Sequence, residues 1–281
     1  MVAITSKKIV VGNDRIYHID LAGDPARPPI MLLHGFTGSR SSWTPFLPAL
    51  ATKYHVVIPD LPGHGESFVS PNIYNMTMNV TAQDLKEILQ RLGIKHTGIL
   101  GYSMGGRLAL HMQLYAAELV DFLILESSTA GIANFGERIE RRQKDDSLAG
   151  KIESRGLTWF VDYWSNIPLF SAHSRLPSAV KERERQIRLS HNPYGLAQSL
   201  RAAGTGRQAS LWPVLPYYRA PTLIIAGEDD EKFQAIGRHL HRQLSRSQFI
   251  VIDGAGHTTH LEQPERFSTA VTDFLQTLHV R

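Results

Sequence analysis

The stretch that most constrains the fold is Gly101-Tyr102-Ser103-Met104-Gly105, which places one serine in a Gly-x-Ser-x-Gly pattern. The apolar run Gly98–Leu100 precedes it, and the helix-forming run Arg107–Ala117 follows it. A serine on such a strand-to-helix turn has a strained backbone, and glycines on either side leave room for it. The turn also places the Met104 amide at a helix N-terminus, where it can stabilise a developing oxyanion. The stretch therefore predicts an exposed serine hydroxyl between a strand and a helix.

Strands and helices alternate on both sides of this turn, which predicts an α/β fold with a mostly parallel sheet and right-handed crossovers. The predicted strands are Lys8–Val11, Arg15–Ile19, Pro29–Leu33, His55–Pro59, Thr97–Leu100, Asp121–Glu126, Pro221–Ala226 and Gln248–Ile252. The first two form an antiparallel hairpin around Gly12-Asn13-Asp14. The predicted helices, besides the one after the serine, are Ser42–Ala51, Val80–Leu92, Glu231–Leu244 and Pro264–Leu278.

The alternation stops in the middle of the chain. Residues 129–213 carry helical patterns, many charges and several aromatic residues, but no convincing buried strand. The strand pattern resumes at Pro221. The simplest interpretation is a single domain, 1–281, with a helical cap inserted at about 129–213 between two strands of the core.

Two later strands end in polar residues that can serve Ser103. The strand ending at Ala226 continues into Gly227-Glu228-Asp229-Asp230, and the strand ending at Ile252 continues to His257. Serine, acid and histidine in this order follow the chain order of the α/β-hydrolase triad. His257 would take the proton from Ser103, and the acid would orient the imidazole.

Three acids compete for the third position of the triad. Asp229 and Asp230 are adjacent, and Glu126 ends the strand that follows the serine turn. We choose Asp230, although it could also cap the helix that begins at Glu231. The turn His34–Gly38 should supply the second oxyanion donor through the Phe36 amide, with His34 as a structural residue beneath it.

Composition narrows the possible functions. The 281 residues contain no cysteine, so disulfides and thiol chemistry are excluded, and no His-Glu-x-x-His or dinucleotide-binding glycine pattern indicates a metal or cofactor. Thirty basic and 26 acidic residues give a net charge of +4 without a long basic run, which does not favour nucleic acid. The first eight residues lack the apolar core of a signal peptide, and no long apolar span follows. We therefore expect a cytoplasmic protein without membrane insertion; the sequence does not predict its oligomeric state.

These motifs resemble the α/β-hydrolase superfamily over nearly the whole chain. They include His34–Gly38, Asp60–Ser67, the serine turn and Ala255-Gly256-His257. A finer match extends through Gly101–Arg107, Glu126–Ser128, Glu137–Arg142, Trp164–Phe170 and Gly227–Phe233. These segments resemble the 2-succinyl-6-hydroxy-2,4-cyclohexadiene-1-carboxylate synthases of menaquinone biosynthesis.

That resemblance implies a lyase rather than a hydrolase. The family's substrate, 2-succinyl-5-enolpyruvyl-6-hydroxy-3-cyclohexene-1-carboxylate, carries three carboxylates and loses pyruvate after a proton beside the succinyl carbonyl is removed. Ser103 would act as the base, and the amides of Phe36 and Met104 would stabilise the enolate. The resemblance also implies a substrate-binding set: Tyr102, Arg107, Arg141, Trp164 and Arg188.

The charge of Arg107 supports this interpretation independently. Arg107 lies one turn into a helix, where its charge opposes the helix dipole and an anionic ligand would offset the cost. We therefore expect its removal to weaken binding while leaving or raising thermal stability. We interpret Arg138 and Arg142 as surface residues.

Two alternatives to the lyase function remain. One is a serine hydrolase acting on an ester or carbon–carbon bond of an acidic small molecule, and the other is a non-catalytic ligand receptor.

Overall fold

One eight-stranded sheet forms the centre of the protein in the computed structural model, which describes residues 2–278; Met1 of the N-terminal stretch lies outside them. The strands are β1 (Ile4–Val11), β2 (Arg15–Ala22), β3 (Pro29–Leu33), β4 (His55–Pro59), β5 (Thr97–Tyr102), β6 (Val120–Glu126), β7 (Thr222–Gly227) and β8 (Ser247–Ile252). Their order across the sheet is β1-β2-β4-β3-β5-β6-β7-β8. β1 and β2 pair antiparallel, β2 pairs antiparallel with β4, and the other pairs are parallel. The mostly parallel sheet and the hairpin were both predicted from the sequence.

The parallel strands are apolar on both faces because helices cover both faces. Side chains alternate between two hydrophobic clusters along each strand: Met31 and Leu33 belong to one, and Ile30 and Leu32 to the other. Helices α2 (Met78–Arg91), α3 (Met104–Tyr115) and α7 (Glu231–Gln243) contribute to the first cluster. α1 (Leu47–Leu50) and α9 (Pro264–Thr277) contribute to the second.

The helix predicted at Ser42–Ala51 differs from the structure. The chain there forms the 3-10 helix η1 (Arg40–Phe46), followed by the single turn α1. Pro45 lies inside η1 and Pro48 in the first turn of α1. Because proline has no amide hydrogen to donate, a continuous α-helix over this segment is disfavoured.

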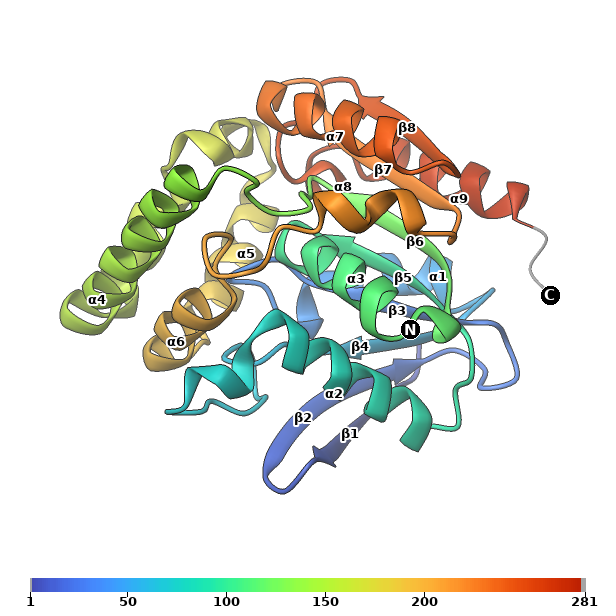
Figure 1. Cartoon of the computed structure of the whole chain (residues 1–281), viewed down its shortest axis with the longest axis horizontal. Helices are drawn as coiled ribbons and strands as arrows, with labels where there is room; N and C mark the ends of the chain where they lie inside the picture. Colours follow the sequence, from blue (N-terminus) through green and yellow to red (C-terminus); the bar gives the residue numbers. More distant parts are fainter. Residues whose placement is uncertain (1, 279–281) are drawn as a thin grey trace.

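Between β6 and β7 the chain leaves the sheet and forms a group of helices at its side (Figure 1). These are α4 (Phe135–Ser165), η4 (Pro168–Arg175), α5 (Ser178–Leu189) and α6 (Pro193–Ala203); η5 (Trp212–Tyr217), which follows them, packs against α7 and the core. α4 is interrupted at Gly156, where φ is 81°. A separate small cluster, including Ile152, Phe160 and Leu196, packs α4 against α6, and Phe36 from the core packs against it. We call this group of helices the cap.

The remaining short elements are η2 (Ile73–Met76), η3 (Ala117–Leu119) and α8 (Thr259–Glu262), which the sequence did not predict. α8 follows the loop after β8 and therefore lies close to the carboxyl ends of the parallel strands. Within residues 2–278, every helix is too short or too polar to cross a lipid bilayer.

Candidate active site

Ser103 lies between β5 and α3 in a backbone conformation that serine rarely adopts, with φ 49° and ψ −103°. The neighbouring glycines are required because the chain is crowded here. A Cβ on Gly105 would lie 2.0 Å from the Leu33 carbonyl oxygen, and one on Gly101 would lie 2.4 Å from the Gly105 carbonyl carbon. The Ser103 amide donates to the Glu126 carbonyl at 2.8 Å, which holds the turn against β6. The predicted strained turn is therefore present.

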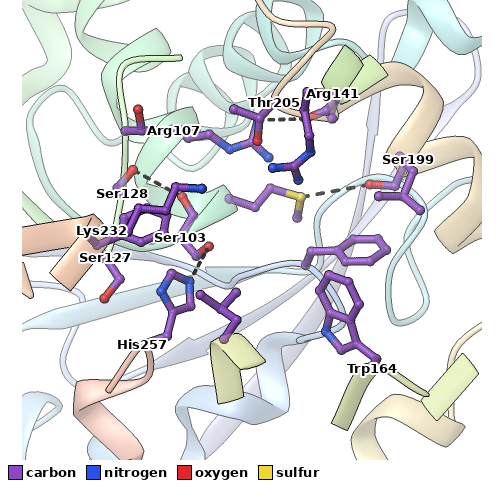
Figure 2. Close-up of a pocket in the computed structure, with 18 residues that line it drawn as sticks. Ser103, Arg107, Ser127, Ser128, Arg141, Trp164, Ser199, Thr205, Lys232 and His257 are labelled. Carbon is purple, nitrogen blue, oxygen red and sulfur yellow. Dashed lines mark hydrogen bonds between the residues drawn. The ribbon is translucent and has the colours of Figure 1, made fainter. Parts of the chain in front are cut away.

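His257 and Asp230 lie beside this serine. The Nε2 atom of His257 is 3.2 Å from Ser103 Oγ, and its Nδ1 atom is 2.6 Å from Asp230 Oδ2 (Figure 2 shows the contact between histidine and serine). The other oxygen of Asp230 accepts from the Phe233 amide at 3.2 Å and caps α7. Asp230 therefore caps the helix with one oxygen and contacts the histidine with the other.

The two competing acids have other partners. Asp229 forms an ion pair with Arg175 at the surface. Glu126 is fully buried and accepts from the Thr259 hydroxyl at 2.7 Å, with His260 Nδ1 2.7 Å away. Both carboxylates are engaged away from His257, which leaves Asp230 as the acid of the arrangement.

The loop after β3 closes over the serine turn. Phe36 from this loop and Met104, the first residue of α3, line one cavity together with Ser103. His34 supports the loop: its Nδ1 donates to the Gly35 carbonyl at 2.8 Å, and its Nε2 accepts from the Leu61 amide at 3.0 Å. Burial lowers the pKa of His34 to about 4, so the ring is neutral near pH 7. This is the structural role predicted for His34.

The cavity above Ser103 has a volume of about 130 Å³ and is rich in cations (Figure 2). Besides Ser103, Met104 and Phe36, its lining includes His257, Arg107, Arg141, Trp164 and Lys232. Arg141 forms an ion pair with Asp145 at 2.9 Å. Lys232 has no ion pair among residues 2–278. Three cations thus share one carboxylate, which suits an anionic ligand.

Arg107 is buried, with 7% of its surface exposed, and its partners are neutral. Its Nη1 donates to the Ala203 carbonyl at 2.8 Å and to Gln208 Oε1 at 2.6 Å. Burial, and then the charge of Arg141, lower the pKa of Arg107 to about 9. The cationic form is therefore disfavoured by the fold although it persists at pH 7. A bound carboxylate would remove this penalty.

The other two predicted binding residues line a separate, smaller hollow. Tyr102 and Arg188 face a space of about 30 Å³ that Phe36 also borders. Arg188 is buried, donates to Ser165 Oγ at 2.8 Å and lies over the Phe170 ring, 5.4 Å from its centroid. The Tyr102 hydroxyl is 3.0 Å from Thr258 Oγ1. The single pocket expected from the sequence is thus divided in two, and Phe36, which packs against the cap cluster, borders both parts.

Several residues near the site were not predicted, among them Lys232, His173 and Glu262. Lys232 lies in the first turn of α7, where its charge opposes the helix dipole, so the argument used for Arg107 could have found it. His173 of η4 lines the smaller hollow, and Glu262 of α8 contacts the loop of His257; neither has a local sequence signal. Arg138 and Arg142, predicted as surface residues, are both partly buried, and neither lines the two cavities.

Comparisons with known proteins give two levels of similarity. The model of the family described as alpha/beta hydrolase fold matches residues 28–264. A protein of Bacillus subtilis (strain 168), provisionally named as a 2-succinyl-6-hydroxy-2,4-cyclohexadiene-1-carboxylate synthase, is 41% identical over 96% of this chain and 98% of its own. The synthase of that name from Photorhabdus laumondii subsp. laumondii is 30% identical over 89% of this chain and 86% of its own.

A solved structure agrees with these relatives. The structure of MenH from S. aureus superposes with a TM-score of 0.88 at 35% sequence identity. The match covers 93% of this chain and 98% of that chain, so it includes the cap as well as the sheet.

Proposed function

This chain belongs to the α/β-hydrolase fold family, and within it to the 2-succinyl-6-hydroxy-2,4-cyclohexadiene-1-carboxylate synthases; from that premise we propose that it eliminates pyruvate from 2-succinyl-5-enolpyruvyl-6-hydroxy-3-cyclohexene-1-carboxylate. The proton beside the succinyl carbonyl leaves first. The ring double bond then shifts, a second forms, and the carbon–oxygen bond to the enolpyruvyl group breaks. The group leaves as the enolate of pyruvate and takes up one proton at its terminal carbon, which gives pyruvate.

One observation carries the proposal: the serine–histidine pair opens into a cavity with more cations than carboxylates. A hydrolase of neutral esters needs the first feature but has no use for the second. A substrate with three carboxylates needs both, since guanidinium groups bind carboxylates through paired, charge-assisted hydrogen bonds.

In this mechanism His257 accepts the Ser103 proton, and the serine oxygen removes the substrate proton. The contact of 2.6 Å between His257 Nδ1 and Asp230 stabilises the imidazolium while the proton is held there. The strained turn presents the serine oxygen towards the cavity, so little reorganisation precedes proton transfer.

Negative charge then develops on the succinyl oxygen. We assign its stabilisation to the backbone amides of Met104, at the N-terminus of α3, and Phe36, in the loop after β3. These amides are fixed before the reaction, which is the condition under which such donors lower a barrier most. Arg107 and Arg141 with Trp164 would bind one end of the substrate, and Arg188 with Tyr102 another.

The substrate is a polar small molecule, so we place the enzyme in the cytoplasm, without nucleic acid or cofactor. The same triad could instead act as a nucleophile on an ester, because a hydrolase needs the same 3.2 Å contact between serine and histidine. This second candidate predicts a covalent acyl-serine, whereas a serine that acts only as a base should form one poorly.

Pyruvate release from the enolpyruvyl substrate, coupled to lactate dehydrogenase and run beside a nitrophenyl ester, tests the proposal. We expect fast pyruvate release and little ester cleavage. Ser103→Ala should lower pyruvate release by about 10²- to 10⁴-fold, the usual contribution of a positioned base. Its melting temperature should not fall, since alanine keeps the turn. Ester cleavage with acyl-serine formation and no pyruvate would make the protein a hydrolase. Tight binding of the substrate without turnover would make it a receptor.

A further inference from the structure

The loop that carries His257 is short and has little intrinsic rigidity. It runs from the end of β8 to α8 and contains Gly254 and Gly256. Both glycines precede His257 and flank Ala255, and Gly254 has a φ of 68°. Glycine gives the backbone many accessible conformations. The contacts of His257 with Ser103 and Asp230 therefore require other groups to fix this loop.

Glu262 of α8 holds the loop on both sides of the histidine. One of its carboxylate oxygens accepts from the Gly256 amide, and the other accepts from the Thr258 amide at 3.2 Å. These two amides belong to the residues immediately before and after His257. Glu262 is not among the residues that line either cavity of the site, and its side chain is only 3% exposed.

The cap closes over this carboxylate. Ala172 of η4 packs against the loop so closely that a Cβ on Gly256 would lie 2.7 Å from the Ala172 side chain. His173 of η4 places Nε2 3.5 Å from Glu262 and 3.0 Å from the Thr258 hydroxyl. Since water is largely excluded, the hydrogen bonds from the two amides to the carboxylate are charge-assisted and stronger than neutral ones.

We propose that Glu262 is a positioning residue for His257: by binding the amides on both sides of the histidine, it holds the imidazole between Ser103 and Asp230. Glu262 does not touch the substrate. It acts by fixing distances of 3.2 Å to the serine and 2.6 Å to the acid. The inference rests on the proposed function, in which His257 moves the serine proton.

Glu262→Gln tests this role because the side chain keeps its shape but its amide nitrogen cannot accept a hydrogen bond. One of the two loop amides then faces a donor. We expect kcat for pyruvate release to fall by about 10- to 100-fold, the scale of a 1 Å misplacement of a reacting group, and KM to change by less than about threefold. Glu265→Gln, at an exposed acid in the first turn of α9, is the matched control and should leave both constants unchanged.

Proton NMR provides a readout that a merely structural role would not change. The hydrogen between His257 Nδ1 and Asp230 should give a low-field resonance in the unmodified protein, which shifts or broadens in Glu262→Gln and stays in Glu265→Gln. A folded Glu262→Gln protein with kcat within twofold and an unchanged resonance would overturn the proposal.

Hydrogen exchange of the unmodified protein covers the case in which Glu262→Gln does not fold. The Gly256 and Thr258 amides should exchange slowly, and fast exchange would overturn the proposed role of Glu262.

His257→Ala separates the proposed function from the proposed role of Glu262. If His257→Ala retains turnover, the proposed mechanism fails; if it is inactive while Glu262→Gln is fully active, only the role of Glu262 fails.

Discussion

Charged side chains at the carboxyl ends of the strands have partners within the protein, whereas those in the cavity beneath the cap largely lack charged partners. At the strand ends, His257 contacts Asp230, and Glu126 is bonded by Thr259 and His260. In the cavity, Lys232 has no ion pair among the described residues and Arg107 has only neutral hydrogen-bond partners. The charged groups of the first region therefore have partners without substrate, and the cations of the second region have few.

Under the proposed function, the first region supplies the proton transfer and the second supplies substrate selection. The proposed triad has its hydrogen-bond partners within the protein, at 2.6 Å between His257 and Asp230 and 3.2 Å between His257 and Ser103. The cationic cavity carries a free-energy cost that only an anionic ligand removes. Substitutions in the two regions should therefore separate turnover from binding.

The largest effect should come from breaking the internal contact of the triad. Asp230→Asn removes the negative partner of His257 and favours the wrong imidazole tautomer, so kcat for pyruvate release should fall by about 10³- to 10⁴-fold. Asp229→Asn is the matched control, because Asp229 pairs with Arg175 at the surface. If Asp229→Asn is the more damaging substitution, our assignment of the acid is wrong.

The next largest effect is on the pH dependence of stability, through buried histidines at the interface between the cap and the core. His191 follows α5 and bonds two core loops: its Nδ1 accepts from the Gly65 amide at 3.1 Å, and its Nε2 donates to the Thr37 carbonyl at 2.9 Å. Its ring lies 5.4 Å from that of His64, which lies 5.1 Å from that of His34. Burial lowers the pKa of all three histidines, to about 4 for His34.

Because these folded-state pKa values lie below 6.5, the unfolded chain binds protons that the folded one does not. The free energy of unfolding should therefore be highest above pH 6.5 and fall as the pH drops towards 4, by about 3 kcal/mol for His34 alone. Urea midpoints between pH 7.5 and 4.5 measure this loss. His191→Gln should reduce the pH dependence, and His96→Gln, at an exposed site, should not. A flat profile would contradict the prediction.

The smallest expected effect comes from replacing Arg107, which should change substrate binding without lowering thermal stability. Its lowered pKa corresponds to a cost on the order of 5 kcal/mol for the buried cation, whereas its two hydrogen bonds contribute about 1 kcal/mol each. Arg107→Met keeps the apolar stem and removes the charge. We expect KM to rise by about 10- to 100-fold, and the melting temperature to stay equal or increase, as the sequence argument anticipated. A large drop in melting temperature would make Arg107 a structural residue.

Much of the fold was predictable because its signals are local. β3 and β4 match their predicted bounds, since continuous apolar runs between polar residues define buried strands. The error at Ser42–Ala51 came from treating Pro45 and Pro48 as compatible with one helix. α8 was missed because four residues are too few to show a periodic pattern.

The sequence by itself determined which residues follow the strands. Parallel strands bring their carboxyl ends to one edge of a sheet, so the position of a residue after a strand fixes its place in the molecule, and Ser103, Asp230 and His257 could be grouped without coordinates. Only the tertiary structure decided how the cap is placed. The packing of Phe36 against the cap helices separates Arg188 from Arg107 and Arg141, and the cap seals Glu262 beside the histidine loop. Those contacts join residues far apart in the chain. They form only when the whole chain is packed, so no local sequence pattern predicts them.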